Sequence, residues 1–269
     1  MKIREIKEKI RLLKINFKKI VTNFYPGILN DEQDTEFYKN EKALVFVVQE
    51  ANRKRAFFAF AEKDALSELL LQIPAETVIE FIYKQEQNPL KMVFENGNMR
   101  KYATYMRKTI CYSDNPFSIP ETGRRKLLEQ MYDPDCGVYA KEEDAVDLYE
   151  LTRATFDILC DDVFTLDQWR KIIEKKECLL YREDGEIIAF YVYRLEGKKL
   201  YSNLSVNKGS ANYLYNLERR VFEEMWERGI RIYYGWFNTK NNKALMRKNE
   251  NKHKAVKSEE IIFNDIYIK

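Results

Sequence analysis

Hydrophobic residues in the C-terminal half of the chain recur at two spacings, three to four residues in some stretches and two in others, which are the periods of helices and strands. Two stretches with helical spacing begin at residues that can cap a helix, Asp144 and Thr165. The second places Trp169, Ile172 and Ile173 on one face. The expected order is a helix over 144–158, a helix from 165, strands over 178–182, 186–195 and 200–206, a long helix that ends near 228, a strand over 230–236, a short helix over 241–248 and a strand over 261–268.

Glycine-containing turns connect these strands. Asp184-Gly185 is the dipeptide of a tight hairpin turn, because both central positions need a positive φ. A second turn at Gly197 completes a three-stranded antiparallel meander. Gly229 stands where helix ends prefer glycine.

The N-terminal half begins with hydrophobic residues at helical spacing from Ile3 to Phe24, opposite a basic face. We expect this helix to dock on the rest of the fold, with binding to a membrane surface as the alternative. The next pattern is a hairpin, followed by a helix capped by Asp64. The expected elements are strands over 43–49 and 55–61, a helix over 65–72, a strand over 77–83, a short helix from Pro89 and a strand over 101–109.

The distribution of proline divides the chain. A length of 269 residues favours two domains, and all six prolines lie at or before Pro134. Pro116, Pro120 and Pro134 fall in one stretch, which also holds a helical segment over 121–131. We therefore expect a lobe over 1–115, a linker over 116–135 and a lobe over 136–269.

Composition excludes several classes of site. The charge is nearly balanced, with 46 basic and 43 acidic residues, so there is no general signal for nucleic acid. The single histidine, His253, and four widely separated cysteines fit no metal-ligand spacing, and we predict no metal. No stretch has the length of a membrane span or the form of a signal peptide, and we expect a cytoplasmic protein.

The order of elements in the C-terminal half resembles the fold of the Gcn5-related N-acyltransferases (GNAT). The residues that carry this resemblance are "LYSNLSVNKGSANYLYNLERRVFEEMWERGIRIYYGWFNTKNNKALMRKN". The N-terminal half resembles a shortened version through "NPLKMVFENGNMRKYATYMRK". The resemblance implies an α+β (α/β) protein with two GNAT-like lobes, each a mixed, mostly antiparallel sheet flanked by helices.

The resemblance also implies a site for acetyl-CoA or another acyl-CoA in the second lobe. Backbone groups of Leu204, Ser205 and Val206 would pair with the pantetheine arm where two strands separate. A loop before a helix presents unpaired N–H groups and the positive end of the helix dipole, which suits a pyrophosphate. The family's pattern would place phosphate contacts on Lys208 and Ala211, and Gly209 and Ser210 would allow the ligand to approach the backbone closely. Asn238 and Asn241 are the candidates for a further cofactor contact.

One large residue departs from the family's pattern at this loop. Tyr213 stands where the family keeps the helix tip bare, and its ring would narrow the pyrophosphate site unless it points away. In the first lobe, Glu62-Lys63-Asp64 places carboxylates at the corresponding helix tip, where they would repel a pyrophosphate. We therefore expect the first lobe not to bind coenzyme A.

The sequence indicates the catalytic residues less clearly than it indicates the cofactor site. The family's tyrosine acid falls on Lys248, which could donate a proton only with a lowered pKa. Glu186, Glu196 and Tyr201 on the meander are the candidates for a base if they point inward. His253 stands in a run of Lys and Asn typical of an exposed loop, which disfavours it as a base.

Three functions remain open. The first is an acyltransferase that moves an acyl group from acyl-CoA to the amine of a small molecule or peptide. The second is an aminoacyl transferase that takes its acyl group from tRNA, through the basic stretches Arg4–Lys19 and Lys240–Lys257. The third is a non-catalytic binding module on a GNAT scaffold, which a blocked opening at Val206 and a helix tip filled by Tyr213 would favour. The oligomeric state is not readable from the sequence.

Overall fold

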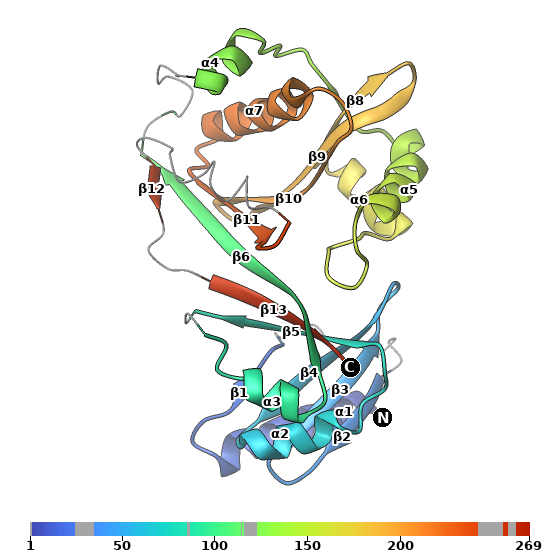
Figure 1. The fold of residues 1–269 in the computed structure, drawn as a ribbon, viewed down its shortest axis with the longest axis vertical. Coiled ribbons are helices and arrows are strands. Elements are labelled where there is room, and N and C mark those ends of the chain that lie inside the picture. Colours follow the sequence, from blue (N-terminus) through green and yellow to red (C-terminus); the bar gives the residue numbers. More distant parts are fainter. Residues whose placement is uncertain are drawn as a thin grey trace. The chain divides into compact units, whose positions relative to one another are not determined.

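The computed structural model describes residues 2–24, 35–84, 87–113, 115, 123–241, 255–257 and 262–269 (Figure 1). The chain forms two compact units. Unit 1 comprises Met1–Met106, Asn238–Asn241 and Glu260–Lys269, and unit 2 comprises Arg107–Phe237 and Asn242–Glu259. The last strand of the chain is thus grouped with the N-terminal half, whereas the sequence pattern alone placed it in the second lobe.

Unit 1 is a mixed sheet with helices on both faces. Its strand order is β2-β3-β4-β5-β13-β6, and β1 pairs with β4. The C-terminal strand β13 therefore lies between β5 and β6 and pairs antiparallel with β5. The elements are α1 (Lys2–Asn16), β1 (Val21–Thr22), β2 (Thr35–Lys39), β3 (Ala43–Gln49), β4 (Lys54–Phe60), α2 (Lys63–Leu70), β5 (Thr77–Tyr83), α3 (Lys91–Asn96), β6 (Arg100–Tyr112) and β13 (Ile262–Ile268).

Alternation along β3 explains the two cores of unit 1. Ala43, Val45 and Val47 pack in the cluster that contains the α2 and α3 side chains, while Leu44 and Phe46 pack in the cluster that contains those of α1. Successive strand residues point to opposite faces, so both faces of this strand are buried. The hairpin pairs Ala43 to Gln49 of β3 with Phe60 to Lys54 of β4, and the expected hairpin is confirmed.

Two expectations about the helices of unit 1 are wrong. The first helix ends at Asn16 rather than near Phe24, since β1 begins at Val21. Docking of this helix is confirmed, because Ile6 and Leu13 are buried against the sheet. Asp64 does not cap α2, which begins at Lys63 after an N-cap residue, Glu62, that makes no side-chain capping bond.

Unit 2 is a second mixed sheet. Its strand order is β6-β11-β10-β9-β8-β7, to which β6 contributes its residues from Arg107, and β12 pairs with Ile110–Tyr112 of β6. The elements are α4 (Gly123–Gln130), β7 (Val138–Tyr139), η1 (Glu142–Asp144), α5 (Ala145–Thr155), α6 (Leu166–Glu174), β8 (Cys178–Glu183), β9 (Glu186–Glu196), β10 (Lys199–Asn207), α7 (Ala211–Glu227), β11 (Ile232–Asn238) and β12 (Ala255–Lys257).

The same alternation separates the two cores of unit 2. Phe190 and Val192 of β9 pack in a cluster with Trp169 of α6, whereas Tyr191 and Tyr193 pack in a cluster with Leu217 of α7. Helices α5 and α6 therefore cover one face of the sheet and α7 covers the other (Figure 1).

Most local signals in unit 2 act as expected. Thr165 accepts a hydrogen bond from the Gln168 amide in a capping box. Asp184 and Gly185 both have positive φ, at 50° and 87°, and Gly229 follows α7 with φ at 79°. Asp144 does not cap α5 through its side chain. Its carboxylate instead accepts a hydrogen bond from the Lys141 amide and pairs with Arg182.

Some expectations lie outside the described residues, namely the helix over 241–248 beyond Asn241, Lys248 and His253. Within the part of the chain that is described, no helix combines the length and the apolar character needed to cross a bilayer.

Candidate functional site

Two parallel strands of unit 2 separate partway along their length. β10 pairs with β11 over Lys199–Ser202 and Ile232–Gly235. Beyond this point β10 continues to Asn207 and β11 to Asn238 without further pairing between them. The backbone groups of a strand point alternately to its two sides. Half of those in the far part of β10 therefore face the opening, and no described segment pairs with them there.

An irregularity in β10 marks the start of this opening. The register between β9 and β10 shifts between Ser202 and Leu204, which leaves Asn203 as the extra residue of a bulge. A bulge bends the strand that carries it and increases its twist. Beyond the bulge, Leu204 and Val206 are buried in the cluster with α5 and α6, so the separated part of β10 is held in place by its side chains.

The far end of β10 leads into the N-terminus of α7. The Lys208 amide donates to the Ile188 carbonyl at 2.9 Å, and the Gly209 amide donates to Asn207 Oδ1 at 3.1 Å. Ser210 is the N-cap residue and makes no side-chain capping bond. Within the described residues, no acceptor contacts the amides of Ser210 or Ala211. The loop therefore presents N–H donors at a helix N-terminus, where the dipole favours an anion.

Tyr213 leans away from the opening. Its ring stacks on Tyr181 of β8 at a centroid distance of 4.1 Å, and β9 lies between β8 and β10 in the sheet. The same ring explains the glycine in the loop, because a Cβ at Gly209 would stand 2.7 Å from the Tyr213 ring and 2.7 Å from Ile188. The absence of a side chain at Gly209 thus makes room for Ile188 and Tyr213. The sequence instead suggests that a glycine there lets a ligand approach the backbone.

Two buried amide oxygens lie along this strand, loop and helix. Asn203 Oδ1, at the bulge, and Asn212 Oδ1, in the first turn of α7, are buried and have no hydrogen-bond partner among the described residues. A buried acceptor without a donor is costly, so such atoms are uncommon in folded proteins. Both atoms therefore lack the donor that the interior of a folded protein normally supplies.

Two strands of unit 1 separate in a similar way, but residues of the same unit pair there. β4 pairs in parallel with β5 only over Lys54–Ala56 and Thr77–Ile79. Beyond that point, Val21 and Thr22 of β1 pair with Phe60 and Ala59 of β4.

Asn23, which follows β1, bridges the two separating strands. Its Nδ2 donates to the Ala56 carbonyl at 3.3 Å and to the Glu80 carbonyl at 3.0 Å, and its Oδ1 accepts from the Phe58 amide at 2.7 Å. We call residues 21–23 the β1 plug. The plug satisfies backbone groups that the corresponding part of unit 2 leaves open.

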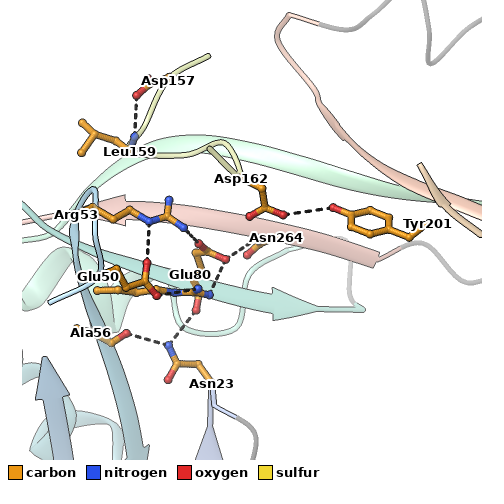
Figure 2. Close-up of polar contacts among 11 residues, drawn as sticks. Asn23, Glu50, Arg53, Ala56, Glu80, Asp157, Leu159, Asp162, Tyr201 and Asn264 are labelled. Atoms are coloured by element: carbon orange, nitrogen blue, oxygen red, sulfur yellow. Dashed lines mark hydrogen bonds and ion pairs between the residues drawn. The ribbon is translucent and has the colours of Figure 1, made fainter. Parts of the chain in front are cut away.

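An ionic cluster lies next to the β1 plug. The Glu80 carboxylate accepts from Arg53 and from Arg55, each at 2.9 Å, and from Asn264 of β13 at 3.3 Å (Figure 2). Glu50 also pairs with Arg53, at 3.3 Å. These contacts hold β4, β5 and β13 together within unit 1.

Tyr201 is the most enclosed of the sequence-predicted catalytic candidates. It lies one residue before the last pair between β10 and β11, and its ring stacks on Tyr234 at 4.9 Å. Its hydroxyl donates to Asp162 Oδ2 at 3.5 Å (Figure 2). Burial and then the Asp162 carboxylate raise the pKa of Tyr201 well above its usual range. The phenol therefore stays protonated near neutral pH and cannot serve as a base there.

The two glutamates predicted as bases do not point into the sheet. Glu186 is exposed at the hairpin between β8 and β9, opposite Glu183. The Glu196 side chain is about half exposed, accepts a hydrogen bond from the Tyr234 hydroxyl and lies 3.7 Å from Arg194.

The predicted cofactor residues are divided between the two units. Leu204–Ala211 forms one continuous strand, loop and helix start in unit 2, whereas Asn238–Asn241 is grouped with unit 1. Asn238 Oδ1 accepts hydrogen bonds from the amides of Lys240 and Asn241, so it shapes the turn after β11.

Sequence reasoning missed Asn23 and Asp162. Asn23 is one asparagine after a two-residue strand, and no local pattern distinguishes it. Asp162 follows Asp161 between two predicted helices, where acidic residues are ordinary. Only the tertiary structure brings these side chains to their partners.

Comparison with known proteins finds similar proteins by structure alone. Neither the protein-family models nor the curated proteins contain a match to this sequence. Among solved structures, a protein assigned to the GNAT acetyltransferase family from Novosphingobium aromaticivorans is similar, with a TM-score of 0.52, 16% identity and coverage of 84% of this chain and 88% of that chain. A GCN5-related N-acetyltransferase from Sphaerobacter thermophilus has a TM-score of 0.54, 14% identity and coverage of 84% and 76%. The tandem arrangement of two GNAT-like lobes stays a prediction. The expected α+β architecture and the resemblance are confirmed at the level of the fold, and the chain has the fold of GNAT acetyltransferases.

Proposed function

We propose that unit 2 is an acyltransferase that binds an acyl-CoA and passes its acyl group to an amine of a small molecule or peptide. The observation that carries this proposal is the opening between β10 and β11, which leads into the uncapped N-terminus of α7. The structural neighbours named as acetyltransferases support the same reaction class.

The chemistry of an acyl-CoA matches the groups that the opening presents. A pantetheine arm carries amides, which can pair with the free edge of β10 as an added strand would. A pyrophosphate is an anion, and the amides of Ser210 and Ala211 meet it at a helix N-terminus with Lys208 beside them. Asn203 Oδ1 and Asn212 Oδ1 add acceptors for ligand N–H groups.

Transfer requires little more than positioning. The amine nitrogen attacks the thioester carbonyl carbon and loses a proton, the carbon–sulfur bond breaks, and the sulfur leaves with the electron pair and takes up a proton. Strand N–H groups would stabilise the negative charge that develops on the carbonyl oxygen. Tyr201 is our candidate hydrogen-bond donor to the sulfur, because it lies at the start of the opening and its phenol is protonated.

Two features favour this function over a non-catalytic scaffold. No described segment fills the opening of unit 2 at Val206, whereas the β1 plug fills that of unit 1. The Tyr213 ring stacks on Tyr181 of β8 and packs against Gly209, and the amides of Ser210 and Ala211 still have no acceptor among the described residues. We therefore propose one acyl-CoA per chain, bound in unit 2.

Calorimetry with acetyl-CoA and CoA tests the proposal. The wild-type chain is expected to bind one CoA, and the Ala211→Asp variant is expected to bind about tenfold or more weakly, because a carboxylate at the helix tip repels the pyrophosphate. An acidic residue in the first turn stabilises a helix, so unfolding would not explain the loss.

The matched control is Ala154→Asp, the same substitution at an exposed position of α5. It is expected to bind CoA like the wild type. Absence of binding at millimolar CoA in folded protein, or equal weakening in both variants, would overturn the proposal.

A further inference from the structure

Helix α1 leaves a basic face exposed on unit 1. Ile6 and Leu13 are buried against the sheet, together with Leu44 and Phe46 of β3. On the solvent side, four basic residues fall within about 80° of helical arc, because they recur at intervals of three and four residues. We call this set the α1 face, which comprises Arg4, Lys7, Arg11 and Lys14.

Positive charge is concentrated at this helix. Residues 2–19 contain eight basic and two acidic residues, a net charge of +6, while the whole chain carries +3. The remainder of the chain therefore has a net charge of −3. The excess is local, so an electrostatic partner of this protein would meet α1 first.

Nearby acids neutralise only part of this charge. Arg11 pairs with Glu8 at 2.7 Å, and Glu5 lies 3.8 Å from Lys39 of β2. Among the described residues, no carboxylate lies in ion-pair range of Lys7 or Lys14. These ammonium groups are available to an external anion.

Two aliphatic side chains are exposed beside the basic stripe. Ile15 is 63% exposed and lies next to Arg4 and Arg11 around the helix, and Leu12 is 39% exposed about 60° further around the helix, beyond Glu8. An anionic lipid surface offers partners to both kinds of side chain, since its headgroups attract Lys and Arg and its acyl boundary accepts aliphatic groups. The phosphates of a nucleic acid attract the same cations, but they provide no apolar surface for the side chains of Ile15 and Leu12.

We propose that the α1 face, with Ile15 and Leu12, is a docking surface for membranes that contain anionic phospholipids. The contact is reversible and salt-dependent, because it rests on a few cations and two aliphatic side chains. It is separate from the proposed acyl-CoA site and stands whether or not that site binds CoA.

Sedimentation with lipid vesicles tests this proposal. Vesicles of phosphatidylcholine with 30% phosphatidylglycerol are compared with vesicles of phosphatidylcholine alone, at low and high NaCl. The chain is expected to bind the anionic vesicles at least tenfold more tightly, and the difference is expected to shrink with salt. Equal binding to both vesicles, or no binding to anionic vesicles at low salt, would overturn the proposal.

Three variants locate the surface. Lys7→Glu with Lys14→Glu is expected to weaken binding at least tenfold. The matched control, Lys171→Glu with Lys175→Glu, makes the same charge change at exposed positions at the end of α6 and is expected to bind like the wild type. Ile15→Ser is expected to weaken vesicle binding severalfold with no change in charge.

A parallel titration with bulk tRNA separates the two kinds of anionic partner. If the chain binds tRNA through Lys7 and Lys14, if Ile15→Ser has no effect, and if anionic vesicles do not bind, then the surface is a nucleic-acid site and the membrane proposal is wrong. Circular dichroism of each variant, compared with the wild type, establishes that α1 is folded in the protein tested.

Discussion

Removal of the Asn23 side chain should open unit 1 along the line where β4 and β5 separate. Asn23 is half-buried. Among the described residues, only its side chain forms hydrogen bonds with the backbone carbonyls of Ala56 and Glu80 and with the backbone N–H of Phe58. In Asn23→Ala these three backbone groups lose their partner at once, and the β1 plug keeps the strand pairs of Val21 and Thr22 and the backbone hydrogen bond from residue 23 to the Phe58 carbonyl.

The size of the effect follows from those three hydrogen bonds. A typical intramolecular hydrogen bond contributes about 1 kcal/mol, and a buried group left without a partner costs about 1–3 kcal/mol. Because Asn23 is only half-buried, water replaces part of what is lost. We expect a local destabilisation of about 2–4 kcal/mol, which corresponds to a loss of amide protection in β4 of roughly 30-fold to 1000-fold.

Hydrogen exchange resolved by peptide is the suitable assay, because the three tryptophans, at 169, 226 and 236, all lie in unit 2. Tryptophan fluorescence therefore reports on unit 2, while exchange of the amides in Phe57–Phe60 reports on the opening in unit 1. The fluorescence transition is expected to change little.

The matched control is Asn96→Ala, which removes an exposed asparagine side chain at the end of α3. Its effect is expected to stay within about 0.5 kcal/mol, as for most surface substitutions. If exchange in β4 were the same in both variants, Asn23 would not join the two strands, and our explanation of why unit 1 is closed would fail.

Three further predictions concern unit 2. Thr165→Ala removes the capping bond to α6 and is expected to destabilise unit 2 by about 1 kcal/mol in urea unfolding followed by tryptophan fluorescence. Gly137→Ala is expected to destabilise more than Gly185→Ala: both have positive φ, but a Cβ at Gly137 would stand 2.3 Å from Leu217, while nothing lies within 4 Å at Gly185. Equal effects would show that backbone strain alone sets the cost. Burial raises the pKa of the Cys178 thiol, so alkylation at pH 8 should modify Cys178 only after unfolding, as peptide mass spectrometry would detect.

The parts of the fold that sequence predicted are those with local causes. Thr77–Tyr83 is a strand because of its β-branched and aromatic residues, and the structure has the same bounds. The turn at Asp184-Gly185 follows from a backbone conformation that few other residues adopt. Such features depend on neighbours in sequence, so a pattern can reveal them.

The parts that sequence could not predict depend on distant contacts. α1 ends at Asn16 although hydrophobic spacing continues, because Phe17 and Ile20 pack in the same core without being helical. The place of β13 between β5 and β6 depends on pairing across most of the chain. The reason for Gly209 is the ring of Tyr213, and the loop sequence alone cannot show where that ring points.

The two openings differ in how their backbone groups are satisfied, and this difference supports assigning the ligand to unit 2. Buried N–H and C=O groups need partners, and strands that separate leave such groups along both edges. In unit 1 the amide side chain of Asn23 and the backbone of β1 provide the partners. In unit 2 no described residue does so for the far part of β10, and Asn203 Oδ1 is also without a partner. The ligand that we propose for unit 2 would therefore carry its own donors and acceptors along an extended chain, as the pantetheine arm does, and an anion at the end that reaches α7.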